Sequence, residues 1–391
     1  MAVEMKERQL HSRLALFYFT YFLMLGAFAP YFALYLKSLG FSSFQIGALL
    51  ALGPITRIIF PPLWAWAADH GWGRGRLVRI ATAAATLVCA GLLFAHGFSW
   101  LFVILLVLNI FWCAALPLVE ATTLGHLTGR LADYGRIRVW GSVSFVLVVA
   151  TLGATLDKVG INLLPLTLTA LFGVCAASAW LLPADTGHVH HGEHVPLGRI
   201  LRRPEVMALF ASCFLMALAH GPYNTFYSIQ LVDHGYSTTS VGWLWALGVI
   251  AEVVAFLWMP RILRRFSLAG VIGFSLACAV VRFLAVGWLV DFGWIMAFAQ
   301  LLHAATFGAH HAAALAVIHQ FFQGRYQARG QALYTSMGFG AGGAAGGLLT
   351  GWMWDHVGPA LTFTAGSAAA LLALLIVATR LRLNQSAHAV A

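Results

Sequence analysis

The sequence predicts an all-α membrane protein with twelve transmembrane helices in two pseudo-symmetric six-helix bundles. Composition, the spacing of the apolar runs and an internal repeat lead to this prediction. The 391-residue chain is 61% apolar and only 9% charged, whereas a soluble domain is about half apolar and roughly a quarter charged. Twelve spans of about 22 residues would occupy roughly 264 positions, which leaves room for short loops.

Twelve apolar runs bounded by charged or turn-forming residues are the expected helices. They cover 14–36, 44–68, 77–95, 100–126, 137–156, 162–182, 206–232, 239–260, 268–289, 292–321, 331–354 and 359–379. Each run approaches or exceeds the length of about 20 residues that crosses a bilayer. The polar stretch between the sixth and seventh runs predicts an N-terminal bundle at 1–183, a cytoplasmic linker at 184–203 and a C-terminal bundle at 204–391.

The positions of the basic residues predict the orientation of these spans. Of 23 lysines and arginines, 19 lie in the two termini and the connections on one side, and only Lys37 and Lys158 lie on the other side. Cytoplasmic loops carry such an excess, so both termini are expected in the cytoplasm. The net charge of +10 therefore reflects topology, and we expect no nucleic-acid partner.

Several other classes of protein are disfavoured. No lysine completes a phosphate-binding loop, no H-E-x-x-H or G-x-S-x-G motif is present, and the five cysteines lie unpaired in apolar runs. The G-x-G-x-x-G match at 338–343 lies inside an apolar span and is interpreted as close helix packing. The histidine-rich segment 188–194 is interpreted as a solvated linker. We therefore expect a protein that is not an enzyme and has no cofactor or metal.

An internal repeat relates the two halves of the chain. Residues 40–53 match residues 235–248 at seven of fourteen positions, an offset of 195 residues. Because an even number of spans lies within each repeat, the two halves have parallel topology. This is the arrangement of a transporter whose binding site lies between two bundles.

A few charged residues lie inside predicted spans, namely Glu120, Glu252, Arg57 and Arg282. Each costs about 2.5–3.5 kcal/mol at mid-membrane, so such residues face a cavity or a partner. The alternative is an ion pair that only locks helices together. Asn109 precedes Glu120 by three helical turns and is expected on the same face. Arg57 and Glu252 are equivalent in the repeat and opposite in charge, so they either pair across the bundles or line opposite walls.

Further polar side chains share helix faces and are candidates to line a site. On the span 206–232, His220, Asn224 and Tyr227 form a polar stripe beside Tyr223, which is expected to face an aqueous cavity. On the span 292–321, His303 and His310 lie seven residues apart and so on one face, with His311 beside them. Two tyrosines of the first span, Tyr21 and Tyr31, lie deep enough to line a site.

Particular stretches resemble a known family. They are DYGRIRVWGS (133–142), HGPYNTFYSIQLVDHGYS (220–237), WLWALGVIAEV (243–253) and the ALPLVEA run that ends at Ala121. Over its whole length the chain resembles the major facilitator superfamily, in the branch of proton symporters similar to lactose permease, and most closely the bacterial 3-phenylpropionate transporter family. The superfamily's loop signature is present in degraded form, which implies a gating loop with Asp69, Arg74 and Arg76.

The resemblance implies roles for particular residues. In the lactose-permease pattern, an acid and an arginine eighteen residues apart hold the substrate, and Glu120 and Arg138 match them. A glutamate, an arginine and a histidine surround the proton site, and Glu252, Arg282 and His303 match those. The sequence departs from the pattern at Thr306, where the family has a second, proton-carrying glutamate.

The departure at position 306 leaves the coupling route open. Glu252 with His303, or the pair His310 and His311, would have to carry the proton instead, and uniport is the alternative.

The leading hypothesis is proton-coupled uptake of a small aromatic carboxylate across the bacterial inner membrane by alternating access. The expected partners are the substrate, protons and the lipid bilayer, and we expect a monomer. Arg57 or Arg138 would bind the carboxylate, and the tyrosines with Trp140 would contact the ring. The alternatives are a proton symporter for a sugar or nucleoside, a drug or lipid exporter, and a receptor that does not transport.

Overall fold

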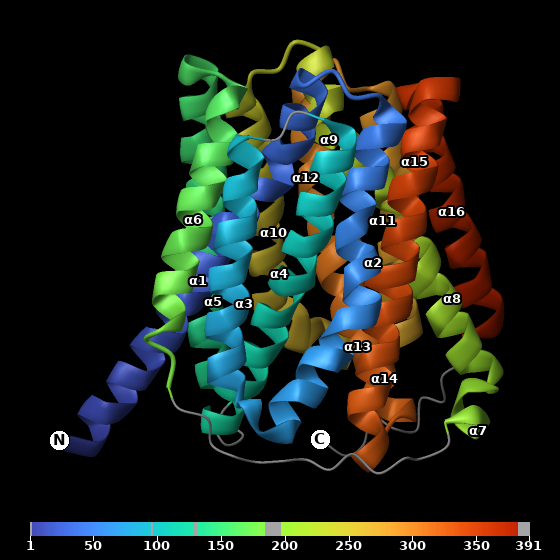
Figure 1. Cartoon of the computed structure of the whole chain (residues 1–391). Helices are drawn as coiled ribbons and strands as arrows, with labels where there is room; N and C mark the ends of the chain where they lie inside the picture. The colour runs from blue at the N-terminus through green and yellow to red at the C-terminus, as the bar shows by residue number, and fades with distance from the viewer. Residues whose placement is uncertain (1, 95–96, 128–130, 184–196, 382–391) are drawn as a thin grey trace. The chain divides into compact units, whose positions relative to one another are not determined.

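The computed structural model describes residues 2–94, 97–127, 131–183 and 197–381, and the regular elements within these ranges are helices (Figure 1). Eleven of the described helical runs are long and apolar enough to cross a membrane. The all-helical membrane fold predicted from the sequence is confirmed. The predicted linker lies partly outside this description, since residues 184–196, including the histidine-rich segment, are not among the described residues.

Six long helices form the first half of the chain. They are α1 (Ala2–Ser38), α2 (Ser43–Ala67), α3 (Arg74–Ala90), α4 (Phe98–Leu127), α5 (Leu131–Val159) and α6 (Leu164–Ala179). Short 3-10 turns η2 (Gly91–Leu93) and η3 (Ile161–Leu163) and the π-helical η1 (Ala68–Trp72) complete this part. The six expected spans are all present. In lipid, an uninterrupted apolar run of this length forms a helix because a helix satisfies the hydrogen bonds of its own backbone N–H and C=O groups.

The second half contains more breaks. It comprises α7 (Gly198–Leu201), α8 (Pro204–Ala219), α9 (Gly221–Asp233), α10 (Thr238–Arg265), α11 (Leu268–Trp288), α12 (Gly293–Leu301), the π-helical η4 (Ala304–Ala309), α13 (His310–Phe321), η5 (Gly324–Tyr326), α14 (Gln327–Tyr334), the π-helical η6 (Thr335–Gly342), α15 (Gly343–Val357) and α16 (Pro359–Arg380). The seventh expected span is divided at His220, two residues before Pro222 in the first turn of α9. The expected span 331–354 lies within the run α14–η6–α15, and the seven glycines between residues 331 and 354 lower its hydropathy.

The chain forms two compact units. Unit 1 contains residues 1–41, 59–191 and 236–246, and unit 2 contains residues 42–58, 192–235 and 247–391. In unit 1, α1 packs against α5 and α6, and α3 packs against α4 and α6; in unit 2, α16 packs against α8 and α11. The start of α2 thus belongs to unit 2 and the start of α10 to unit 1. The division into bundles at 1–183 and 204–391 stays a prediction.

Repeat-related glycines allow these two helix starts to pack closely. In unit 2, Gly47 of α2 lies against Gly347 and Gly351 of α15, and a Cβ on Gly47 would come 2.6 Å from the Gly347 carbonyl oxygen. In unit 1, Gly242 of α10 lies against the Val149 carbonyl of α5, with no room for a Cβ. The glycines of η6 and α15 therefore serve close helix packing, as the sequence indicates.

Acidic residues bind the backbone at the same two helix starts. The Asp157 carboxylate of α5 accepts hydrogen bonds from Thr238 N (2.8 Å) and Thr239 N (2.9 Å) in α10 and from both threonine hydroxyls. The Asp355 carboxylate of α15 accepts hydrogen bonds from Ser43 N (3.3 Å) and Phe44 N (3.0 Å) in α2. Unpaired N–H groups and the positive end of the helix dipole favour a carboxylate at such a position.

Candidate functional site

Unit 1 brings the predicted substrate residues Glu120 and Arg138 together around aromatic side chains. The Tyr134 hydroxyl donates a hydrogen bond to Glu120 Oε1 at 3.5 Å, one helical turn from Arg138 on α5. The Arg138 guanidinium lies 3.9 Å from the centre of the Phe22 ring and 5.8 Å from that of Tyr18, both on α1. Among the described residues it forms no ion pair within 4.0 Å with Glu120. The guanidinium therefore keeps donors for a ligand anion.

The other predicted residues of unit 1 have local or buried roles. The Asn109 amide donates a hydrogen bond to Leu105 O of its own helix at 2.8 Å. The Tyr31 side chain is fully buried, and its hydroxyl donates to Val149 O at 2.5 Å. It thus fastens α1 to α5 near the start of α10.

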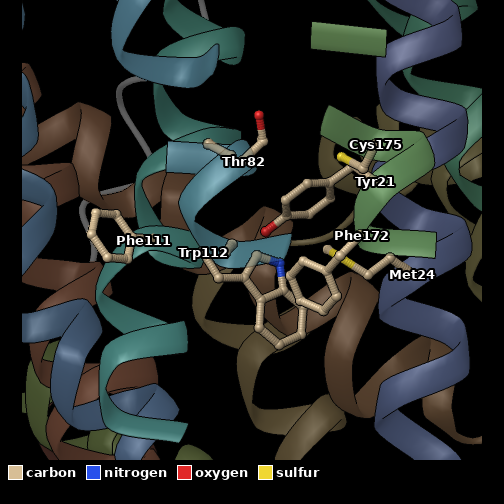
Figure 2. A pocket seen from close by; sticks show the side chains of 9 residues that line it. Tyr21, Met24, Thr82, Phe111, Trp112, Phe172 and Cys175 are labelled. Atoms are coloured by element: carbon tan, nitrogen blue, oxygen red, sulfur yellow. The ribbon is translucent and has the colours of Figure 1, made fainter. Parts of the chain in front are cut away.

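Tyr21 lines a small pocket inside unit 1. Figure 2 shows it with Trp112 and Phe172 around this pocket, whose cavity volume is about 10 Å³. This volume accommodates about one water molecule. The pocket is therefore too small for an organic substrate.

Unit 2 brings an acid and an imidazole into contact inside the membrane-spanning region. Glu252 Oε2 of α10 lies 3.5 Å from Nε2 of His303, at the end of α12, and the two side chains are 18% and 13% exposed. Glu252 therefore contacts a histidine, and the repeat-related Arg57, which is assigned to the same unit, is exposed on α2. Two titratable groups in contact and partly open to their surroundings can exchange a proton.

Arg282 lies beside this pair in a network of neutral side chains. Its Nη1 donates to Thr306 Oγ1 at 2.9 Å and its Nη2 to Gln300 Oε1 at 3.5 Å. Its guanidinium lies 4.1 Å from the centre of the Tyr223 ring, and the Tyr223 hydroxyl also donates to Gln300 Oε1, at 3.0 Å. The arginine is fully buried, and within the described residues no carboxylate oxygen lies within 4.0 Å of it. Thr306, where the lactose-permease pattern led us to expect a second glutamate, is thus a neutral hydrogen-bond acceptor for Arg282.

The polar stripe predicted on the seventh span is mostly buried. The His220 and Tyr227 side chains are 6% and 0% exposed, while Asn224 is exposed. His220 Nδ1 lies 2.8 Å from Met216 O, and its ring lies edge-on to Phe283. Two of the three positions of the stripe are therefore packed inside unit 2 and do not face an aqueous cavity.

The two remaining histidines differ in their surroundings. His310 is buried, whereas His311 is half-buried and its Nδ1 lies 2.8 Å from the Tyr334 hydroxyl. His311, rather than His310, continues the row of His303. The π-helical segment η4, between His303 and His310, changes the helical register. The prediction that His303 and His310 share a face assumed a regular α-helix and did not include this change.

The predicted gating loop forms a local structure in unit 1. Asp69 of η1 and Arg74 of α3 line one pocket of about 180 Å³ together with Trp64 and Pro117. The Arg76 guanidinium lies 5.4 Å from the centre of the Trp72 ring. The structure thus brings Asp69 and Arg74 together and places Arg76 on a neighbouring aromatic ring.

Comparisons with known proteins identify the family. The model of the MFS_1 like family matches residues 11–365. The chain belongs to this family. It is 30% identical over 355 residues to the probable 3-phenylpropionic acid transporter of Escherichia coli (strain K12), covering 88% of this chain and 91% of that protein. It is 27% identical to the maltose permease of Geobacillus stearothermophilus, with 94% of each covered. The crystal structure of the nucleoside transporter NupG has a TM-score of 0.84 at 14% identity, covering 96% of this chain and all of that one.

Membership of the MFS_1 like family confirms the class of protein that the sequence predicts. The chain is a multi-pass membrane protein and a secondary transporter of a small molecule, and its relatives are transporters rather than enzymes. Within the described ranges, no three His, Cys, Asp or Glu side chains gather as a metal site requires.

Three residues of the site were not selected from the sequence. Tyr134 lies four positions before Arg138 and therefore on the same helix face, a signal that was available. Gln300 and Phe307 lie three positions before and four positions after His303. The spacing of Gln300 could have identified it, but the alignment of Phe307 depends on the π-helical segment.

Proposed function

We propose that this transporter couples the uptake of a small aromatic carboxylate to protons, by alternating access across the bacterial inner membrane, with both termini in the cytoplasm. The contact between Glu252 and His303 is the observation that carries the coupling. Both groups titrate, they lie 3.5 Å apart, and they are retained in membrane-spanning helices despite the cost of a charge there. The substrate class follows from the similarity to the probable 3-phenylpropionic acid transporter.

Coupling in this proposal depends on the charge of Glu252. With a proton bound, the carboxyl group is neutral and its desolvation costs little when the transporter changes state. After the proton leaves, the carboxylate is stabilised by the His303 imidazole at 3.5 Å. Thr306 carries no proton in this step because its hydroxyl, which accepts a hydrogen bond from Arg282, is not a titratable group.

Binding of a carboxylate requires a fixed cation. Arg138 is half-buried in unit 1, and its guanidinium lies against Phe22 without an ion pair to Glu120, as described above. Arg57, exposed on α2, is the second candidate. Arginine suits this role because its planar donors engage both oxygens of a carboxylate.

A second candidate function is proton symport of a sugar or nucleoside. Glu120 has a half-buried carboxylate, and its hydrogen bond from Tyr134 is long, at 3.5 Å. Such a carboxylate can accept hydrogen bonds from substrate hydroxyl groups. The similarity to a maltose permease supports this alternative.

Uptake into liposomes with an imposed pH gradient tests the proposal. Purified protein is offered 3-phenylpropionate, maltose and a nucleoside side by side, as the wild type and as Glu252→Gln. We expect the wild type to accumulate 3-phenylpropionate, and Glu252→Gln to abolish accumulation against a gradient while exchange of labelled for unlabelled substrate continues. This split arises because the variant is permanently uncharged at the coupling position.

Asp291→Asn is the matched control, since Asp291 is exposed and lies 4.0 Å from a histidine, His234, in a loop contact. It should accumulate substrate as the wild type does. Uptake of maltose or the nucleoside alone would establish the second candidate function. Accumulation by Glu252→Gln with unchanged pH dependence would refute the coupling role.

A further inference from the structure

Two π-helical segments gather five aromatic rings in unit 2. η4 carries Phe307 and η6 carries Phe339, and His303, His311 and Tyr334 complete the group. The His303 and Phe307 rings are parallel within 5°, with centroids 5.4 Å apart, and the Phe307 and His311 rings are parallel within 11° at 6.4 Å. We call these five residues the ring cluster.

The parallel row within the ring cluster depends on the π-helical turn. In a regular α-helix, residues four apart differ by about 40° around the axis, so eight residues drift by about 80°. The wider π turn rotates less per residue and compensates for this drift. His303, Phe307 and His311 therefore lie in one row, which an uninterrupted α-helix would not produce. Segments of this kind are rare and are frequently found at functional sites.

Neighbouring rings hold the row in place but leave Phe307 accessible. The Phe339 ring lies 6.0 Å from Phe307 at 59° and 5.9 Å from His311, and it meets Tyr334 edge-on at 5.7 Å. The hydrogen-bonding contact of 2.8 Å between His311 and the Tyr334 hydroxyl fixes the far end. The Phe307 side chain nevertheless remains 36% exposed.

Two polar side chains that are themselves partly exposed lie beside Phe307. Its parallel neighbour His303 contacts Glu252, and both of these polar side chains are partly exposed. A partly exposed carboxylate on the lipid side would carry a large desolvation cost. A Cβ at Gly308 would lie only 3.1 Å from Glu252 Cγ, so the acid runs directly along the segment that carries Phe307.

The geometry points to Phe307, supported by Phe339, as the surface that binds the aromatic ring of the substrate. These two residues then determine the preference for a carboxylate with an aromatic ring over one with a saturated ring. This inference rests on the proposed substrate class and deepens it. A ring that packs edge-on or offset against Phe307 gains the quadrupole attraction of an aromatic pair, which a cyclohexyl group of similar size does not gain.

The predicted magnitude follows from that difference. Aromatic pairs contribute about 0.5–1.5 kcal/mol beyond the area they bury, which corresponds to about twofold to twelvefold in affinity. Replacing Phe307 by leucine removes this contribution and keeps an apolar side chain at the position.

Competition in liposomes tests the inference with two ligands that share a carboxylate and chain length, 3-phenylpropionate and 3-cyclohexylpropionate. The wild type should bind the phenyl compound more tightly. Phe307→Leu should weaken 3-phenylpropionate by about twofold to twelvefold and leave 3-cyclohexylpropionate within twofold, while Phe307→Tyr should keep the preference. Phe298→Leu is the control, since Phe298 is 52% exposed on the neighbouring α12, outside the ring cluster.

Each outcome has a distinct meaning. Equal weakening of both ligands, or an unchanged preference in both Phe307→Leu and Phe339→Leu, overturns the inference while leaving the transport of carboxylates established. Transport of neither ligand by the wild type overturns the proposed substrate class and the inference with it. The melting temperature of each purified variant is measured alongside. If Phe307→Leu has a folding defect, the ligand preference of Phe339→Leu tests the inference instead.

Discussion

The hydrogen bonds of Asp157 predict which residue stabilises the docked start of α10. The carboxylate accepts two backbone and two hydroxyl hydrogen bonds from Thr238 and Thr239, whereas the related Asp355 accepts two longer backbone bonds from the start of α2. Loss of a side-chain acceptor at a helix start costs about 0.5–2 kcal/mol. Because Asp157 binds four donors, we expect Asp157→Ala to lie near the upper end, at about 1–2 kcal/mol, or a factor of about 5–30 in an equilibrium.

Cysteine accessibility measures this equilibrium directly. Val241 of α10 and Ile46 of α2 are repeat-related positions, 0% and 2% exposed. A cysteine is placed at one or the other after the five native cysteines are replaced by serine. Asp157→Ala should raise the rate of maleimide labelling at Val241→Cys by about 5–30-fold. Asp355→Ala should have a smaller effect at Ile46→Cys.

Alternating access adds a stricter expectation. If both helix starts undock in the same conformational step, Asp157→Ala also raises labelling at Ile46→Cys. Lys158→Ala, an exposed neighbour of Asp157, should change neither rate. An unchanged rate at Val241→Cys would refute the reasoning about the hydrogen bonds. An increase confined to Val241→Cys would show local fraying of α10 and refute the link to the transport cycle.

Two further substitutions follow from the packing. Thr306→Val removes the hydroxyl that accepts from Arg282 at 2.9 Å and leaves a buried guanidinium short of one acceptor. The free energy of unfolding should fall by about 1–3 kcal/mol, measured as a lower melting temperature in detergent. Thr306→Ser should keep most of the stability, and an equal loss in both variants would contradict the role of the hydroxyl. Gly242→Ala places a methyl group against the Val149 carbonyl, where there is no space, so α10 should undock from α5. If both helix starts undock in one step, labelling at Ile46→Cys should then rise, and an unchanged or lower rate would contradict this.

The helical register around His303 illustrates what a residue pattern does not contain. The sequence places His303 and His310 on one face because seven residues complete nearly two turns of an α-helix. In the structure the row is His303, Phe307 and His311, and His310 is buried. The change arises from a shift of the backbone hydrogen bonds over residues 304–309. No residue type there marks it, since alanine, threonine, phenylalanine and glycine all occur in regular helices.

Composition and charge alone determined the class of this protein. With 61% apolar and 9% charged residues, the chain cannot cover a soluble surface, and its apolar runs have the length that a bilayer requires. The charged positions inside those runs were also identifiable, because each one costs free energy in lipid and is rarely present without a role.

Only the tertiary structure decided which of these charged residues meet. Glu252 contacts His303, Arg282 is held by the neutral Thr306 and Gln300, and the starts of α2 and α10 belong to units different from the rest of those helices. Such pairings depend on helix ends, π-helical turns and glycine contacts between segments far apart in the chain. Hydropathy depends on a residue's own transfer free energy and can be read locally, whereas a contact depends on the position of both partners in the folded chain.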